Sequence, residues 1–429
     1  MPSGEALPVI APPSLCDAAH GQGGKPGRRS RLYFGLVAFS FFVIITGGGL
    51  PTPLYVVYQK AWGFSPAILT VVFAVYAVGL LLTLVVFRRA SDRLGRRKVL
   101  VAGVLVAIAS TVVFLLATNV GWLILARVLS GVSVGLTAST ASAALTEFEP
   151  SGDRRRAAKW ITVITAVGVG IGPFYAGFLV QYGPDPLTLS FWILLALLLP
   201  ALVATWMIRE PSHAVPGTAP ATAPVSRLPP GVRPVFVLSA LAAFVGFALA
   251  GIFSGLAPSF LVSDLHITNH ALAGATVLLM FGSAAIAQLL GQQRRSHPMT
   301  RLGAVLAPVG LVSIASAAWT GLAFPFFVGT VLCGAGFGLA LMGGLGMLNQ
   351  VAPPDRRGEV LSGFYVAAYL GLSVPIVGIG VIADSFGLAV AVVVFSIVIS
   401  ALSLTVILSR EPALEPAAPS LPARSSSSN

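Results

Sequence analysis

Long apolar segments alternate with short polar ones along most of the chain. A helix of about 20 residues spans the roughly 30 Å hydrocarbon core of a bilayer, because each residue adds about 1.5 Å. The pattern therefore predicts an all-α membrane protein with twelve transmembrane helices. The apolar segments cover residues 33–58, 66–87, 99–117, 121–147, 157–182, 187–208, 234–262, 270–291, 302–318, 322–350, 357–384 and 386–408.

A polar segment near the middle divides these helices into two sets of six. A linker rich in Pro, Ala, Ser and Thr at residues 209–233 separates a bundle at 33–208 from a bundle at 234–408. We expect residues 1–32 and 409–429, which are rich in Pro, Ala and Ser, to be disordered cytoplasmic tails. The N-terminal tail lacks the apolar core of a signal peptide, so we expect no cleavage there.

The two sets of helices repeat each other. The tripeptide Asp-Arg-Arg occurs at residues 153–155 and again at 355–357, and Pro173 and Pro375 lie at the same separation of 202 residues. Such duplication is typical of carriers whose halves rock about a central site. We therefore predict two pseudo-symmetric six-helix bundles.

Composition and charge agree with this prediction. Hydrophobic residues make up 56% of the chain and charged residues only 9%, against about 25% charged in soluble domains. If the loops alternate between the membrane faces, all but Lys60 and Arg127 of the 26 Lys and Arg fall on the side of the termini. Because short loops rich in Lys and Arg stay in the cytoplasm, the net charge of +12 reflects orientation, with both termini cytoplasmic. We expect no nucleic-acid partner.

The loop at residues 88–98 is the most charged of these segments. Its sequence Asp-Arg-x-Gly-Arg-Arg, at residues 92–97, contains a glycine that permits a turn and an acid that can cap the next helix. This pattern resembles the signature loop between helices 2 and 3 of the major facilitator superfamily of secondary transporters, although Arg88 stands where that family usually has glycine. We expect a cytoplasmic gate formed by Asp92, Arg93, Gly95, Arg96, Arg97 and Glu147, in which Asp92 helps to hold the cytoplasmic side closed.

The fifth apolar segment carries a second motif. Gly168, Gly172 and Gly177 place small residues on the helix, and Pro173 removes one backbone hydrogen bond. An ordinary packing seam of small residues explains the glycines alone. With the Gly-Pro pair, the segment resembles the helix 5 motif typical of proton-driven antiporters of the superfamily.

Arg127 is the only basic residue that we predict within a transmembrane helix. It begins the pattern Arg127-x-x-x-Gly131-x-x-x-Gly135, whose glycines recur in the tenth segment as Gly334 and Gly338. The run is similar to the superfamily's helix 4 motif, in which the arginine is associated with coupling to protons. A side chain that snorkels to the headgroups is the alternative.

A coupling role for Arg127 needs a partner, because an arginine cannot itself carry the proton. It could lower the pKa of a nearby acid, for which Asp264 and Asp384 are the outer-side candidates, or it could bind an anionic substrate. None of the 14 acids falls at mid-membrane, so we expect neutral or anionic substrates and not permanent cations.

Two further groups of residues bear on the site. Glu147 and Glu149 end the fourth segment, where they either pair with Arg93, Arg96 or Arg97 or remain solvated. Aromatic and polar residues near the middle of helices are candidates to line a cavity. These are Tyr76, Thr137, Tyr175, Phe247, Tyr365 and Tyr369.

Together these features predict a secondary active transporter that exports small hydrophobic molecules by proton-coupled alternating access. An uptake symporter for a nutrient or metabolite is the alternative, and a channel fits the duplicated loops less well. An enzyme is disfavoured because the sequence has no His-Glu-x-x-His motif and its histidines lie in tails, loops or helix ends. We expect a monomer in the cell membrane, with lipid, substrate and protons as its partners and with no cofactor or metal.

Overall fold

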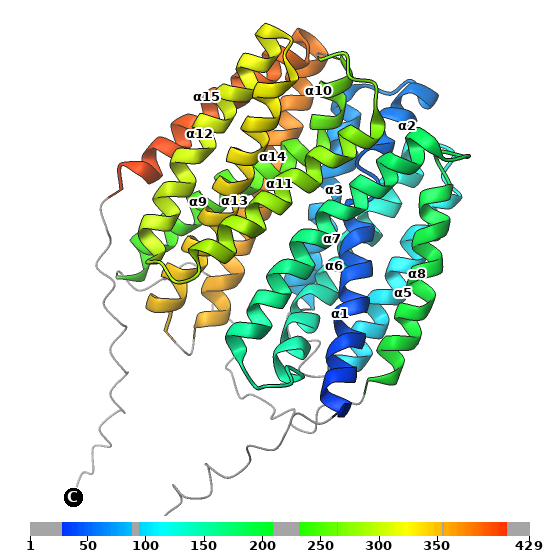
Figure 1. Ribbon diagram of the computed structural model, residues 1–429, viewed down its shortest axis with the longest axis vertical. Helices are drawn as coiled ribbons and strands as arrows, with labels where there is room; N and C mark the ends of the chain where they lie inside the picture. Colours follow the sequence, from blue (N-terminus) through cyan, green and yellow to red (C-terminus); the bar gives the residue numbers. More distant parts are fainter. Residues whose placement is uncertain (1–27, 88–93, 209–230, 264, 354–355, 410–429) are drawn as a thin grey trace, which may run out of the picture.

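The computed structural model describes residues 28–87, 94–208, 231–263, 265–353 and 356–409. Within these residues the secondary structure is helical, and twelve spans are long and apolar enough to cross a membrane. Figure 1 shows the helices running roughly parallel to one another in two groups. The predicted fold class, an all-α membrane protein with twelve transmembrane helices, is confirmed.

The first group of helices forms the N-terminal half. Its elements are α1 (Arg28–Gly49), α2 (Leu54–Trp62), α3 (Pro66–Val86), α5 (Arg96–Leu115), α6 (Val120–Glu147), α7 (Arg154–Tyr182) and α8 (Leu189–Met207). Helix α6 packs against α3 and α5, while α1 packs against α6, α7 and α8. The long helix α6 is therefore central to this half.

The second group forms the C-terminal half. Its elements are α9 (Val232–Gly255), α10 (Ala257–Ser263), α11 (His270–Gly291), α12 (Ser296–Thr320), α13 (Ala323–Val351), α14 (Arg357–Phe386) and α15 (Leu388–Ile407). Helix α13 packs against α11 and α12, and α9 packs against α13, α14 and α15. These are the pairings of the first half in the same order, so the two bundles are pseudo-symmetric.

The first helix of each half is broken, which the apolar segments 33–58 and 234–262 do not predict. The first break follows α1, where Pro51 and Pro53 lack the amide hydrogens that would continue the helix. Short turns replace the helix there, with the amide of Leu54 donating to the carbonyl of Pro51 at 3.0 Å. In the second half, Leu256 separates α9 from α10.

Several helices also begin before their apolar segments do. Helix α12 starts at Ser296, so Arg301 lies in its second turn, and Arg31 lies in the first turn of α1. The prediction that Arg127 is the only basic residue in a helix is therefore wrong, because polar first turns extend helices beyond the hydrocarbon-length run. Arg127 differs from Arg31 and Arg301 because it is buried, with only 2% of its surface exposed.

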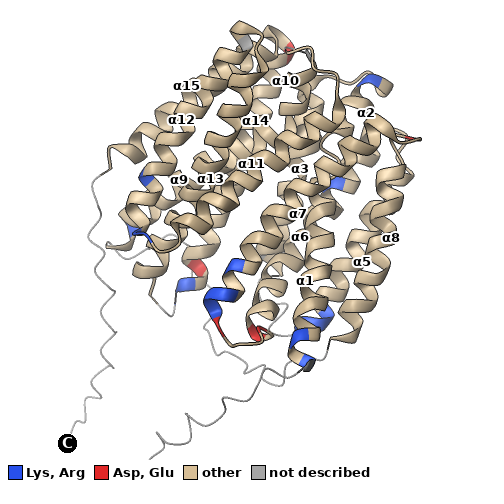
Figure 2. Cartoon of the chain, viewed as in Figure 1, with Lys and Arg blue, Asp and Glu red and all other residues tan. Residues whose placement is uncertain are grey.

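The ends of the chain define two faces of the molecule. Helix α1 begins and α15 ends at the same face, which we call the tail side, and we call the opposite face the far side (Figure 1). Figure 2 shows that Lys and Arg gather toward the tail side. Helices α2 and α10 lie on the far side.

The halves meet chiefly through α7 with α11 and α3 with α14. At their far-side ends, the amide of His270 donates to the Gln181 side chain at 2.9 Å, and Asn269 donates to the Tyr182 hydroxyl at 3.4 Å. The amide of Ala67 donates to Asp384 at 3.3 Å. Toward the tail side the two groups of helices separate (Figure 1).

Candidate functional site

The position of Arg127 follows from the glycines that come after it on α6. A Cβ atom on Gly131 would collide with the carbonyl oxygen of Tyr76, and one on Gly135 would lie 3.1 Å from the carbonyl oxygen of Leu80. Only glycine permits this approach, so the backbones of α3 and α6 are in direct contact. Arg127, one turn earlier, therefore emerges where α6 faces both α1 and α3.

The guanidinium of Arg127 lies in a cage of aromatic rings. Its Cζ is 4.5 Å from the ring centroid of Tyr76, 5.5 Å from that of Phe73 and 6.0 Å from that of Tyr55. Nη1 donates to the carbonyl oxygen of Gly48 at 2.8 Å. The side chain is 2% exposed, which excludes the snorkelling alternative.

Asp384, one of the two acids expected to work with Arg127, does not pair with it. Among the described residues, no carboxylate forms an ion pair with this guanidinium. Asp384 instead accepts a hydrogen bond from the first turn of α3, and Asp264 lies outside the described residues. The rings of the cage are thus the groups that stabilise the charge, through cation–π contacts.

Sequence reasoning identified Tyr76 but missed the other two rings of the cage. Phe73 and Tyr76 are three residues apart on α3 and so share a helix face. That spacing could have identified Phe73 as a neighbour of Tyr76 from the sequence alone. Tyr55 lies on α2, beyond the proline break, and no local pattern connects it with α6.

Two of the helix 5 glycines pack against α1. A Cβ atom on Gly168 would lie 3.0 Å from the Ile45 side chain, and one on Gly172 would collide with the carbonyl oxygen of Thr46. These two positions are four residues apart, so they lie on one face of α7. The face forms a seam between α7 and α1 within the N-terminal half.

Gly177 lies on a different face of α7, toward the C-terminal half. A Cβ atom there would collide with the carbonyl oxygen of His270 on α11, and one on Gly274 would collide with the carbonyl oxygen of Pro173. The expectation of small residues on one face was therefore too simple, because a five-residue step turns the chain well away from the first seam. Helix α7 is packed tightly on both sides.

The gate loop is only partly described, since Asp92 and Arg93 lie outside the described residues. Gly95 precedes α5 with φ of 93°, a conformation that favours glycine. Arg96 pairs with Glu147 at 2.8 Å, which joins the tail-side ends of α5 and α6. Arg97 stacks on the ring of Trp206, with its Cζ 4.9 Å from the centroid.

Glu149 is buried, unlike the solvated acid that we considered. Its carboxylate accepts hydrogen bonds from the amide and hydroxyl of Ser151, both at 2.7 Å, and from the amide of Asp153 at 2.9 Å. Burial raises the pKa of Glu149, but these hydrogen bonds and the charge of Arg156 outweigh it and leave the pKa below its ordinary value. Glu149 thus stabilises the turn between α6 and α7.

Four of the cavity candidates, drawn from both halves, lie near one another. Tyr76, Phe247, Tyr365 and Tyr369 are all half-buried. The ring centroid of Phe247 is 5.3 Å from that of Tyr369 and 5.4 Å from that of Phe337. The Tyr369 side chain lies near that of Tyr76, which belongs to the other half. These four residues and Phe337 form what we call the aromatic wall. The sequence predicted the four but not Phe337.

The other two candidates face their own bundle. Thr137 is fully buried, donates to the carbonyl oxygen of Ser133 and packs against Gly103 of α5. The hydroxyl of Tyr175 donates to the carbonyl oxygen of Ser190 on α8 at 3.1 Å. Neither side chain is placed to meet a substrate between the halves.

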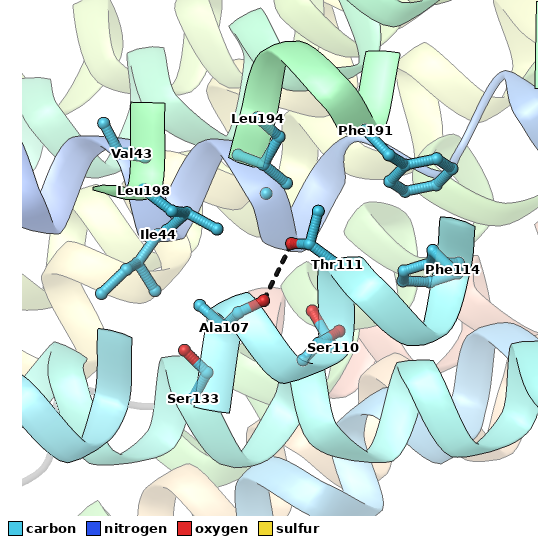
Figure 3. A pocket seen from close by; sticks show the side chains of 12 residues that line it. Val43, Ile44, Ala107, Ser110, Thr111, Phe114, Ser133, Phe191, Leu194 and Leu198 are labelled. Atoms are coloured by element: carbon cyan, nitrogen blue, oxygen red, sulfur yellow. Dashed lines mark hydrogen bonds between the residues drawn. The ribbon is translucent and has the colours of Figure 1, made fainter. Parts of the chain in front are cut away.

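A small cavity lies within the N-terminal half, between α1, α5, α6 and α8. Its volume is about 20 Å³, and it is lined by apolar side chains together with hydroxyls such as those of Ser110, Thr111 and Ser133 (Figure 3). That is room for roughly one water molecule. It is too small for an organic substrate and lies apart from the aromatic wall.

Comparison with known proteins identifies the family. Residues 37–374 match the family described as the Major Facilitator Superfamily. The chain belongs to the major facilitator superfamily. Members of this superfamily are transporters, so this protein is a membrane transporter and not an enzyme.

Within the superfamily, the chain is similar to drug-resistance proteins. It is 25% identical to Multidrug resistance protein 2 of Bacillus subtilis over 305 residues, which are 67% of this chain and 75% of that protein. It is also 25% identical to Quinolone resistance protein NorA of Staphylococcus aureus over 143 residues, which are 33% of this chain and 37% of NorA. The resemblance to the antiporter group of the superfamily is thereby confirmed.

Solved structures of the superfamily share the fold. A bacterial homologue of the human lysosomal transporter Spinster, solved inward-facing and unoccupied, superposes with a TM-score of 0.70 at 15% identity over 90% of this chain and 98% of that one. Its inward-facing, occupied form gives a TM-score of 0.65 at 17% identity, over 90% and 97% of the two chains.

Proposed function

We propose that this transporter exports small hydrophobic molecules from the cytoplasm in exchange for protons, by alternating access between its two halves. It acts as a monomer in the cell membrane, with the tail side and both termini cytoplasmic. The observation that carries the direction of transport is the likeness to Multidrug resistance protein 2 over 75% of that protein.

The charge distribution supports the orientation. Lys and Arg gather toward the tail side (Figure 2). Positively charged loops are retained in the cytoplasm during membrane insertion. The far side then faces outward.

The contacts between the halves support alternating access. Hydrogen bonds and glycine contacts join α7 to α11 and α3 to α14 at their far-side ends. With the far side closed and the helices separated toward the tail side, the molecule is in a state that receives substrate from the cytoplasm. Opening requires these far-side contacts to break while others form near the gate loop.

Two features support coupling to protons. The Gly172-Pro173 pair lies in the seam between α7 and α1, where a missing backbone hydrogen bond allows the helix to bend. Arg127 is a permanent positive charge at membrane depth, held by rings. We propose that coupling depends on both.

An efflux assay tests this function. Cells lacking their main exporters are loaded with the neutral dye N-phenyl-1-naphthylamine, and its loss is followed with and without the full-length protein. We expect faster loss that stops when a protonophore collapses the proton gradient. Accumulation of dye in place of loss would instead support the uptake symporter, and loss that ignores the gradient would reject proton coupling.

A further inference from the structure

Arg127 is a buried cation whose hydrogen-bonding capacity is not filled. A guanidinium has five N–H donors. Here Nη1 donates to Gly48, whereas Nε is buried without any partner. Buried donors are normally satisfied, and an exception calls for a physical explanation, of which a bound anion is one.

A second unsatisfied group lies beside it. Tyr55 is 1% exposed, its hydroxyl has no hydrogen-bond partner, and the centroid of its ring is 6.0 Å from the guanidinium carbon. A tyrosine hydroxyl and a guanidinium both donate to an anion. The cage around Arg127 therefore offers two unused donors and a positive charge.

Among the residues that the structure describes, no acid lies within ion-pair distance of Arg127. The described acids lie at helix ends or in loops, as with Glu147, Glu359 and Asp384. The remaining acids, by their positions in the sequence, lie in tails or loops. The rings of the cage stabilise the cation without neutralising it.

The cage around Arg127 adjoins the aromatic wall between the halves. Phe73 reaches the C-terminal half, where its ring lies 3.5 Å from the place that a Cβ on Gly255 would occupy. Tyr76 covers the guanidinium and is close to Tyr369 of the opposite wall. For a molecule that binds along this wall, the ring of Tyr76 separates the bound group from the guanidinium of Arg127.

We propose that Arg127 and Tyr55 form the anion-binding end of the substrate site, and that amphipathic carboxylates are the preferred class among the exported substrates. The carboxylate binds Arg127 and the Tyr55 hydroxyl after the ring of Tyr76 turns aside. The apolar body lies against Phe247 and Tyr369. This proposal rests on the proposed export function and names its substrate class.

Binding to the purified full-length protein in nanodiscs tests this proposal. Three probes share one pyrene body and differ in charge: 1-pyrenebutyrate, its methyl ester, and the corresponding butyl-trimethylammonium. In chloride-free buffer at neutral pH, we expect the carboxylate to bind about tenfold more tightly than the ester, because it gains a desolvated charge-assisted pair. The cation should bind most weakly.

Variants locate the preference. Arg127→Gln should remove most of the preference for the carboxylate over the ester, and Arg127→Lys should keep part of it, since the planar fork is lost. Tyr55→Phe should weaken carboxylate binding severalfold and ester binding much less. Lys60→Gln serves as the control, because it removes an exposed cation of α2 that lies outside the aromatic cage. We expect it to leave the preference for the carboxylate over the ester unchanged.

Equal affinity for the carboxylate and the ester in the unmodified protein would overturn the proposal, as would an undiminished preference in Arg127→Gln. If Arg127→Gln does not fold, Arg127→Lys and Tyr55→Phe test the proposal in its place. An unchanged preference for the carboxylate over the ester in both of these variants would overturn the proposal. Dye efflux that persists without any anion preference rejects the anion site alone. Absence of efflux for the dye and for every probe rejects the export function.

Discussion

The fourth transmembrane span of each half, α6 or α13, carries a pair of glycines at equivalent positions, but the residue that precedes the pair differs. Gly131 places α6 against the backbone of α3 at Tyr76, and Gly334 places α13 against the backbone of α11 at Met280. Four residues before each glycine the halves differ. Arg127 enters the aromatic cage, whereas Thr330 is fully buried and donates to Phe326 of its own helix.

The comparison separates architecture from chemistry. The glycines recur because both halves need close helix contact, and they are explained without any function. The arginine occurs in one half only and leaves a charge in the membrane, which packing does not require. We therefore propose that the chemistry of the transporter lies in the N-terminal half and that the C-terminal half supplies a supporting wall.

The largest expected effect comes from replacing, one at a time, the two residues that differ between the halves. Arg127→Ala should abolish gradient-driven efflux in a folded, inserted protein, and Arg127→Lys should restore it only in part. Thr330→Ala should transport nearly normally, because Thr330 bonds only to its own helix. Efflux of dye by vesicles with an imposed proton gradient measures all three. Full activity of Arg127→Ala would end the assignment.

A second pair of variants compares α7 with α14. Gly172→Leu should reduce transport strongly, because its side chain would meet the α1 backbone at Thr46. Gly378→Leu is the matched control, since a Cβ atom on Gly378 meets nothing within 4 Å. Dye efflux normalised to the amount of protein in the membrane checks both. Equal loss in both variants would remove the special role of the α7 seam.

Pro173→Ala restores a backbone hydrogen-bond donor in α7. We expect a stiffer helix and either slower efflux or a leak of protons. Proton uptake by vesicles without substrate distinguishes the two results. Behaviour like that of the unmodified protein would make Pro173 a packing residue only.

The gate loops of the two halves also differ. Asp92 lies among bases between the second and third apolar segments, whereas residues 292–295 of the other half, Gln-Gln-Arg-Arg, contain no acid. Asp92→Asn should leave the amount of protein in the membrane unchanged and cut efflux severalfold, because the proposed gate depends on charge-assisted hydrogen bonds to this carboxylate. Gln292→Ala, in the loop without an acid, is the control. Unimpaired efflux by Asp92→Asn would refute the gate.

The smallest expected effect concerns the turns that follow α6 and α13. Glu149 is a buried acid after α6, whereas the buried residue at the end of α13 is Val351. Because the pKa of Glu149 is below its ordinary value in the folded protein, its contribution to stability is present near neutral pH and is lost as pH falls through that lowered pKa. Thermal unfolding should show Glu149→Gln less stable than the unmodified protein at pH 7, with the difference vanishing in acid. A difference that is independent of pH would contradict this.

The sequence predicted the number of helices and the repeat, because hydrocarbon thickness fixes the length of each apolar run. It did not predict the break after α1, although Pro51 and Pro53 mark it, since the apolar run continues through them. Rotation about the helix axis was the harder problem. Thr137 and Tyr175 lie near mid-helix as expected but face their own bundle, because a helix that is apolar all round gives no sign of which side meets lipid.

The cage around Arg127 could be predicted only in part for a related reason. Its rings come from α2 and α3, and contacts between different helices leave no spacing rule in a single sequence. The separation between equivalent residues of the two halves also changes by one residue where the halves meet. Pro173 and Pro375 align at 202, yet Gly177 and Gly380, which both touch the opposite half, lie 203 apart.

The far-side closure has a consequence for the conditions in which the transporter can work. At Gly177, Gly274 and Gly380 the halves meet through backbone and small side chains, in van der Waals contact and not through pairs of ions. Dissolved ions screen charges over about 8 Å at physiological strength but leave van der Waals contact untouched. These glycine contacts should therefore hold equally well in dilute and in saline surroundings, whereas the exposed hydrogen bond from Ala67 to the Asp384 carboxylate should weaken as salt on the far side rises.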